Sequence, residues 1–177
     1  MAIYRILSLD GGGIRGLLSA VVLEQLDAAC PGWRDRIDLI AGTSTGGILA
    51  LGLAFGLTPT DLRVLYYDKG GDIFHDTLLD DLHDLGRAIG AEYDNRYLRR
   101  ELERIFGDTP LGKLRKKVLI PAFDLDNEDP DPEKRTWKPK FFHNFGGRDS
   151  DADVRVVDVA LYTSAAPTYF PSVDGYI

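Results

Sequence analysis

The chain has a single cysteine, Cys30, among 177 residues, so no internal disulfide can form and a reducing compartment, the cytoplasm, is expected. Basic residues are also few: 21 Lys and Arg stand against 28 Asp and Glu, which gives a formal net charge of −7. No basic stripe offsets this charge, and a nucleic-acid partner is therefore not expected. Arg5 and Asp10 interrupt the first apolar run, which favours a first strand over a secretory signal.

Charge is absent altogether from the stretch Leu39 to Thr60, which makes it a candidate membrane span. Repeated glycines and the Thr43-Ser44-Thr45 triplet would weaken a spanning helix, and they suit a buried strand followed by a buried helix. With 44% hydrophobic and 28% charged residues, the composition is that of an ordinary soluble protein. We therefore expect one domain over residues 1–177.

The uncharged stretch contains a G-x-S-x-G motif, Gly42-Thr43-Ser44-Thr45-Gly46. The preceding run Ile37–Ala41 predicts a strand, and the following run Gly47–Phe55 predicts a buried helix. A strand, a sharp turn and a helix in this order are typical of a nucleophile elbow, in which the serine projects above the sheet at a helix N-terminus. A phosphate-binding loop is disfavoured because no Lys-Ser/Thr pair follows the glycines.

A second glycine loop, residues 11–16, follows a predicted strand at Ile3–Leu9 and precedes a predicted helix. Gly11, Gly13 and Gly16 formally match the dinucleotide fingerprint G-x-G-x-x-G, so a dinucleotide-binding, Rossmann-like module is an alternative. A dinucleotide-binding site needs an acidic residue at the end of the second strand, and this chain has the serine elbow there. The consecutive glycines also suit an oxyanion hole made of backbone N–H groups.

The rest of the chain predicts further helices and strands. A helix is expected to start with Thr58 as N-cap and Pro59 as its first residue, and to stop at Gly70-Gly71. Asp72–Gly90 is expected to be mobile or cap-like. The other expected elements are helices at Asn95–Phe106 and Val154–Ser164 and strands at Val118–Leu125 and Lys140–Phe145. Asp124, Asp126 and Glu128 leave open a calcium loop, although its glycine and distal glutamate are missing.

A serine nucleophile usually needs a histidine base, and none of the three histidines is well placed. His75 and His83 lie in the polar segment after the predicted helix, and His143 lies in the middle of a predicted strand. A Ser44/His143 pair is an alternative, but in G-x-S-x-G hydrolases the histidine stands on a late loop. The sequence favours a carboxylate that acts directly on the serine.

Three motifs in order, Asp10–Gly16, Gly42–Gly46 and Thr163–Phe170, resemble the patatin-like phospholipases over nearly the whole chain. The resemblance implies an α/β fold, a three-layer α/β/α sandwich around a mostly parallel sheet. It implies a lipid acyl hydrolase with a serine–aspartate dyad and with no metal or other cofactor. The implied partner is a lipid substrate, met by peripheral contact with membranes or lipid aggregates, and the oligomeric state is left open.

By this resemblance, Ser44 is the nucleophile that attacks a lipid ester carbonyl and forms an acyl-serine. The backbone N–H groups of Gly11, Gly12 and Gly13 would hold the oxyanion. Arg15 matches the basic position of the loop, although a solvent-facing arginine at a helix start is an equal alternative. The implied elbow residues around the nucleophile are Gly42, Thr43, Thr45 and Gly46.

The base is the point at which the chain departs from the family pattern, where the catalytic aspartate stands in Asp-Gly-Gly or Asp-Gly-Ala. The chain's Asp-Gly-Gly, at residue 10, belongs to the glycine loop. Asp174-Gly175 is positioned like the family's pair, but Tyr176 follows it and strand-forming residues flank it, which predicts a hairpin turn. Either Asp174 is the base, or the chain is a C-terminally truncated, inactive lipid-binding fragment that ends just short of its catalytic aspartate.

Overall fold

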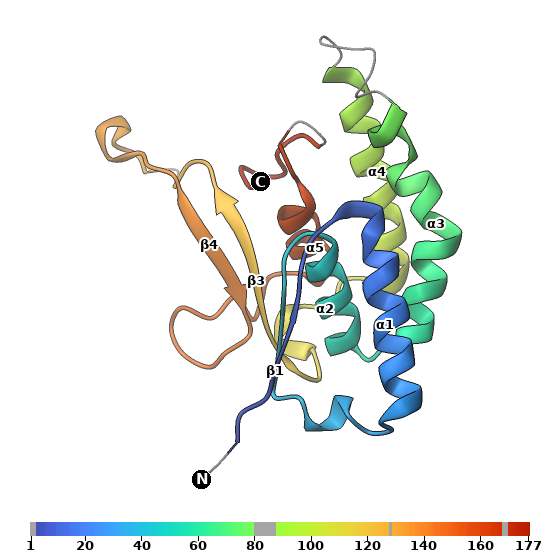
Figure 1. Ribbon diagram of the computed structural model, residues 1–177. Helices are drawn as coiled ribbons and strands as arrows, with labels where there is room; N and C mark the ends of the chain where they lie inside the picture. Colours follow the sequence, from blue (N-terminus) through green and yellow to red (C-terminus); the bar gives the residue numbers. More distant parts are fainter. Residues whose placement is uncertain (1–2, 80–87, 128, 168–169) are drawn as a thin grey trace.

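The computed structural model describes residues 3–79, 88–127, 129–167 and 170–177 (Figure 1). The strands and helices in chain order are β1 (Ile6–Leu9), α1 (Gly16–Ala29), β2 (Leu39–Gly42), α2 (Thr45–Phe55), α3 (Pro59–Leu79), α4 (Ala88–Phe106), β3 (Lys117–Asp124), β4 (Lys138–His143) and α5 (Val156–Ser164). The strands form one four-stranded sheet in the order β1-β2-β3-β4. The first three strands are parallel, and β4 is antiparallel to β3. The predicted α/β fold around a mostly parallel sheet is therefore confirmed.

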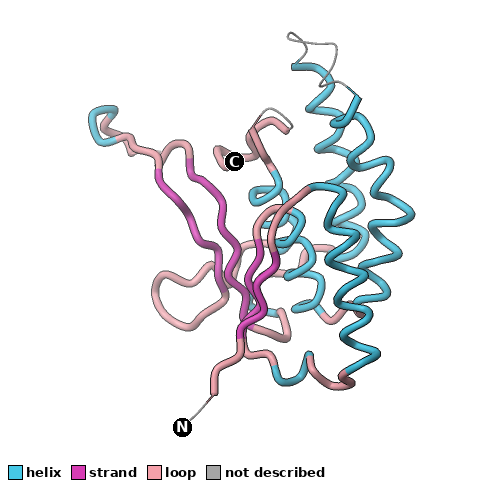
Figure 2. The backbone as a smooth tube through the Cα atoms, in the orientation of Figure 1, coloured by secondary structure: helices cyan, strands magenta, loops and turns pink. Residues whose placement is uncertain are grey.

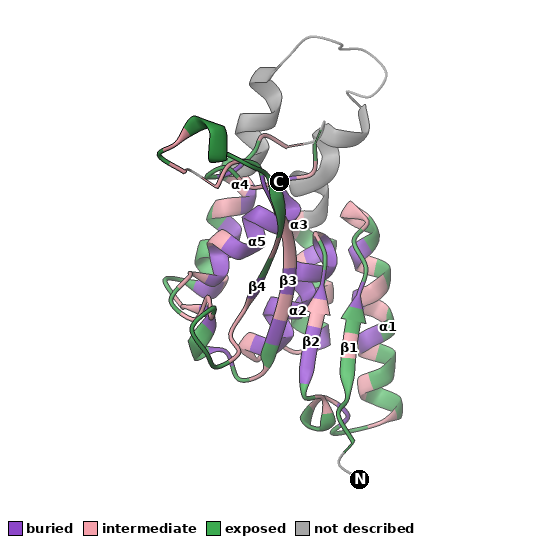
Figure 3. Ribbon diagram, turned by 90° about the vertical axis from the view of Figure 1, so that its left-hand side faces the viewer, coloured by how far each residue is buried: buried purple, intermediate pink, exposed green. Residues whose placement is uncertain are grey.

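The helices lie together on one face of the sheet (Figures 1 and 2). Successive strands step in one direction across the sheet, and right-handed crossovers then place α1 and α2 on the same face. Figure 3 looks onto the opposite face, where the described strands carry no helical cover. The described residues thus supply the sheet and one helical layer.

The register of the paired strands explains which side chains of the sheet belong to the core. Ile40 pairs with Val118, and Ile120 pairs with Phe142, so these four side chains project from the helix-covered face and are buried. Alternate residues point the other way, and there Ile6 and Phe141 are 59% and 52% exposed.

The uncharged stretch is divided between β2 and the 11-residue helix α2, which lies in the core with Thr45 to Ala54 buried. A helix of this length is about half of what a bilayer requires. Across the described ranges, none of the helices combines the length and the apolar character that a membrane span needs. Gly56 ends α2 with φ of 116° and donates its N–H to the carbonyls of Gly52 and Leu53. Only glycine adopts this backbone conformation readily.

Most predicted elements are confirmed with ends shifted by a few residues, but the prediction that Gly70-Gly71 ends a helix is wrong. Helix α3 begins at Pro59 as expected and continues through both glycines to Leu79. Glycine costs only about 1 kcal/mol in a helix interior, and the buried Leu62 and Tyr66 anchor the first half of α3. Residues 72–79 and 88–90 of the segment expected to be mobile or cap-like are helical, and residues 80–87 lie outside the described part.

Candidate active site

Ser44 lies two residues after the end of β2 and is the N-cap of α2, so the strand, turn and helix predicted around it are present. Its backbone has φ of 54° and ψ of −126°. A positive φ of this kind costs a residue other than glycine about 1–3 kcal/mol, and the surrounding structure has to hold it. The Ser44 side chain makes no hydrogen bond within the described part of the chain and is half-buried. Its hydroxyl therefore stands at the carboxyl end of the parallel strands with no structural partner.

Two glycines allow the turn to be this tight. A Cβ atom added to Gly42 would lie 2.2 Å from the carbonyl oxygen of Gly46, and one added to Gly46 would lie 2.1 Å from the carbonyl oxygen of Leu9. Both distances are far below van der Waals contact, and both neighbours are backbone atoms that have no rotamer to change. Gly42 and Gly46 therefore bring β1, β2 and α2 together at one point beneath Ser44.

The first glycine loop lies against the elbow. A Cβ atom added to Gly11 would lie 3.1 Å from Cβ of Ser44, and the hydroxyl of Thr45 donates a 2.8 Å hydrogen bond to the carbonyl of Gly13. Among the described residues, no backbone hydrogen bond outside the helices and strands uses the N–H groups of Gly11, Gly12 or Gly13. The two predicted motifs are thus adjacent, and the loop has free donors beside Ser44.

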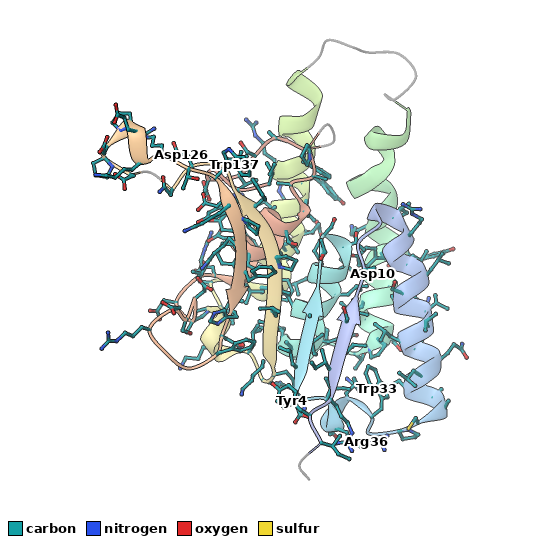
Figure 4. The ribbon with its side chains drawn as sticks, turned by 60° about the vertical axis from the view of Figure 1, so that its left-hand side comes forward. Tyr4, Asp10, Trp33, Arg36, Asp126 and Trp137 are labelled. Carbon is teal, nitrogen blue, oxygen red and sulfur yellow. The ribbon has the colours of Figure 1, made fainter. Side chains whose placement is uncertain are left out.

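Arg15 is exposed at the start of α1, and its Nε donates a 3.2 Å hydrogen bond to the carbonyl of Gly12. The backbone N–H of Arg15 donates to the same carbonyl at 3.1 Å. Arg15 thus faces solvent and also bonds the glycine loop, and its role at the oxyanion hole stays a prediction. Figure 4 shows Asp10, which begins this loop, at the carboxyl end of β1.

Two supporting residues were not singled out from the sequence. Thr163, near the end of α5, accepts a 2.9 Å hydrogen bond through Oγ1 from the backbone N–H of Ser44. The hydroxyl of Tyr66 donates a 3.2 Å hydrogen bond to the carbonyl of Thr45. Burial raises the pKa of Tyr66 well above its usual value, so it remains a neutral donor. Thr163 belongs to the third family motif, and only that motif could have pointed to it. For Tyr66 the sequence offered no indication beyond its helical spacing.

Asp174 lies in a turn near the end of the chain. It has φ of 48° in a turn that pairs Val173 with Tyr176, so the predicted hairpin turn is present. Its carboxylate accepts a 3.0 Å hydrogen bond from the hydroxyl of Tyr162. Burial, with a smaller contribution from Asp174, raises the pKa of Tyr162 and keeps it protonated. In the part of the chain that is described, no hydrogen bond links the carboxylate to Ser44.

The alternatives raised by the sequence gain no support from the geometry. His143 Nδ1 accepts a 3.3 Å hydrogen bond from the backbone N–H of Phe145, and its ring stacks on the Phe145 ring at 4.6 Å. These contacts are those of a structural histidine on β4. His83 and Glu128 lie outside the described residues, as does the His75 side chain. The described residues include no cluster of His, Cys, Asp and Glu that could hold a metal.

Comparisons with known proteins agree with one another. A family model described as patatin-like phospholipase matches residues 7–176. A protein of Pseudomonas aeruginosa named cGAMP-activated phospholipase is 38% identical over 169 residues, which cover 95% of this chain and 48% of that protein. Patatin-17 of Solanum cardiophyllum is 31% identical over 185 residues, which cover 94% of this chain and 43% of that protein. The chain spans about half the length of the curated relatives it matches.

Solved structures show the same fold at low sequence identity. The ExoU–SpcU complex of Pseudomonas aeruginosa superposes with a TM-score of 0.56 at 18% identity, covering 97% of this chain and 38% of that one. VipD of Legionella pneumophila superposes with a TM-score of 0.54 at 13% identity, covering 98% of this chain and 45% of that one.

Proposed function

This chain belongs to the patatin-like phospholipase family, and from that premise we propose that it hydrolyses carboxylic ester bonds of phospholipids or related lipids through an acyl-serine intermediate. The observation that carries the proposal is the strained backbone of Ser44, held with a free hydroxyl beside a loop of unused N–H groups. Strain of about 1–3 kcal/mol at such a turn is expected where a side chain has to be presented for chemistry. The phospholipase names of the relatives support the choice of substrate class.

In the proposed reaction, Ser44 Oγ attacks the ester carbonyl carbon while its proton passes to a carboxylate base. The carbonyl oxygen gains the negative charge, and the N–H groups of Gly11, Gly12 and Gly13 stabilise it together with the N-terminus of α2. Collapse of the tetrahedral intermediate releases the alcohol, which takes the proton, and leaves the acyl group on Ser44. Water then hydrolyses the acyl-serine by the same steps. Each oxyanion donor is worth about 10²- to 10³-fold in rate.

The reaction also requires a carboxylate base that accepts the proton of Ser44. Asp174 is a candidate because it stands where the family places its aspartate, yet its hydrogen bond to Tyr162 gives it a structural role as well. The segment that follows it pairs with β3 through two hydrogen bonds between Phe123 and Ile177, of 2.6 and 3.0 Å. We propose that Asp174 turns the chain and that another carboxylate serves as base. We propose further that the protein works in the cytoplasm and meets lipid peripherally.

The test compares the parent chain with Ser44→Ala in the release of fatty acid from phosphatidylcholine and phosphatidylglycerol vesicles. Loss of the nucleophile is expected to lower the rate by at least about 10³-fold, with an unchanged far-UV circular dichroism spectrum. Ser150→Ala, a half-buried serine in the loop before α5, is the matched control and keeps the parental rate. Parental release by folded Ser44→Ala would refute the nucleophile assignment.

Asp174→Asn separates the two choices of base. A fall to the level of Ser44→Ala would identify Asp174 as the base, since loss of a general base costs about 10²- to 10⁴-fold. Retention of most activity would support another carboxylate. If the parent chain binds vesicles but releases no fatty acid, the inactive lipid-binding alternative is favoured.

A further inference from the structure

A pocket of about 170 Å³ lies between the 3-10 helix Arg34–Arg36, the C-terminal end of α2 and the start of β3. Gly56, which ends α2, contributes to its wall, whereas Ser44 stands at the other end of the same helix. An 11-residue helix is roughly 16 Å long, so the pocket is well separated from the candidate active site. Figure 4 shows this separation, with Trp33 and Asp10 labelled at opposite ends of the sheet. This pocket has no part in the proposed hydrolysis.

Its polar side chains include more hydrogen-bond donors than acceptors. The indole N–H of Trp33 is buried without a hydrogen-bond partner. Arg115 forms no salt bridge or side-chain hydrogen bond with any described residue. Lys116 donates to the carbonyls of Asp35 and Ile37, at 3.0 and 2.9 Å, and an ammonium group has a third N–H. The Trp33 N–H lies behind the accessible wall, so the donors open to a ligand are those of Arg115 and Lys116, and they favour a ligand that brings acceptors.

The charges of the wall are also unbalanced. Arg34 is neutralised by Asp27, whose carboxylate lies 3.0 Å from its Nε. That leaves Arg115 and Lys116 opposed in the wall by the carboxylate of Asp35 alone. The pocket is therefore locally positive in a chain whose formal net charge is −7. Such a contrast favours an anion over a neutral ligand.

The Arg115 side chain packs closely on Gly56, in space that the side chain of any other residue at position 56 would occupy. A Cβ atom added at residue 56 would lie 2.6 Å from a guanidinium nitrogen of Arg115. The exposed guanidinium therefore packs against the last turn of α2, where a positive charge is favourable. A guanidinium offers a planar fork of donors suited to two oxygens of one phosphate.

From these observations we propose that the pocket binds a phosphate group. The cationic donors Arg115 and Lys116 offer N–H groups from more than one direction, and a tetrahedral oxyanion with several oxygens can accept from them. A volume of about 170 Å³ far exceeds the roughly 10–15 Å³ that one water needs on the same measure, and it accommodates a phosphate with part of an attached group. The phosphate can belong to a soluble molecule or to a lipid headgroup, and the experiment below distinguishes these sources.

The first experiment titrates ¹⁵N-labelled chain with sodium phosphate at pH 7 and follows its two tryptophan indole peaks, with sodium chloride at matched ionic strength as reference. The Trp33 peak is expected to shift saturably with a Kd of about 1 mM or tighter. The peak of Trp137, which is 68% exposed on another part of the surface, should not follow it. Trp137→Phe assigns the two peaks.

Arg115→Gln is expected to weaken phosphate binding at least tenfold, while Arg100→Gln, an exposed arginine on α4, leaves it unchanged. Lys116→Gln, which removes the other cation of the wall, should also weaken binding measured by calorimetry, and it keeps the test decisive if Arg115→Gln does not fold. Flotation with phosphatidylglycerol vesicles that depends on Arg115 would identify a lipid headgroup as the source. Phosphate binding without such flotation would identify a soluble phosphate.

The proposal is overturned if phosphate shifts the Trp33 peak no more than chloride does, or if folded Arg115→Gln binds phosphate as tightly as the parent. Either result would leave Arg115 as a capping cation on α2. Neither measurement uses catalysis, so failure here and failure of the proposed hydrolase activity are independent.

Discussion

Replacing Thr163 with valine tests whether α5 holds the serine turn in place. The Thr163 side chain is 7% exposed, and its Oγ1 accepts the N–H of Ser44 at 2.9 Å. Its methyl group packs tightly on α2, because a Cβ atom added to Gly47 would lie 2.8 Å from it. Valine keeps this shape and removes the acceptor. The expected loss in unfolding free energy is about 1–3 kcal/mol, the cost of leaving a largely buried N–H without a partner.

The assay combines urea unfolding with hydrogen exchange of the Ser44 amide. In Thr163→Val that amide should exchange at least about fivefold faster than in the parent, since about 1.4 kcal/mol of lost protection is a factor of ten and the expected loss is about 1–3 kcal/mol. Thr163→Ser is the matched control, because it keeps the hydroxyl and loses a methyl group worth about 0.8 kcal/mol. It should lose some stability but retain protection at Ser44.

The two variants therefore separate packing from hydrogen bonding. Unchanged Ser44 exchange in Thr163→Val, with stability within about 0.5 kcal/mol of the parent, would refute the role assigned to this hydrogen bond. Equal loss of protection in both variants would show that the methyl group, rather than the hydroxyl, restrains the turn.

Three further predictions concern the same region and the start of α3. Ser44→Gly should be more stable than Ser44→Ala by about 0.5–2 kcal/mol in urea unfolding, because glycine relieves the positive φ, and equal stabilities would contradict the strain. Gly46→Ala should lose about 3 kcal/mol or fail to fold, since its Cβ atom would overlap the Leu9 carbonyl, and parental stability would be inconsistent with the packing described. Hydrogen bonds from Thr58 lower the pKa of Asp61, so this carboxylate stabilises the fold above its unfolded pKa, near 4, and less as pH falls through its lower folded pKa. Asp61→Asn should reduce the acid dependence of unfolding below about pH 5, and an unchanged pH profile would argue against it.

Local features of the site could be predicted because they depend on neighbouring residues. The start of α3 is an example: Thr58 and Asp61 exchange hydrogen bonds of 2.7–3.1 Å around Pro59, as their spacing suggests. The strand, turn and helix around Ser44 follow in the same way from a short apolar run, small residues and a buried helix. The hairpin turn at Asp174 is equally local.

Other features depend on contacts between distant segments and could not be predicted. The hydrogen bond from Ser44 to Thr163 joins residues 119 positions apart, and nothing in either neighbourhood specifies the partner. The continuation of α3 through Gly70-Gly71 similarly depends on tertiary anchoring, which overrides local propensity. The pocket around Trp33 requires three segments that only the fold brings together.

The position of Thr163 on the last described helix has a consequence for the order of events during synthesis. A ribosome that adds about 5–20 residues per second needs roughly 6–24 s to cover the 119 positions between Ser44 and Thr163. During that interval the nascent chain contains the serine but not the hydroxyl that restrains its backbone. The Ser44 N–H therefore gains this acceptor only after α5 has emerged and docked, so the serine turn is completed late in synthesis.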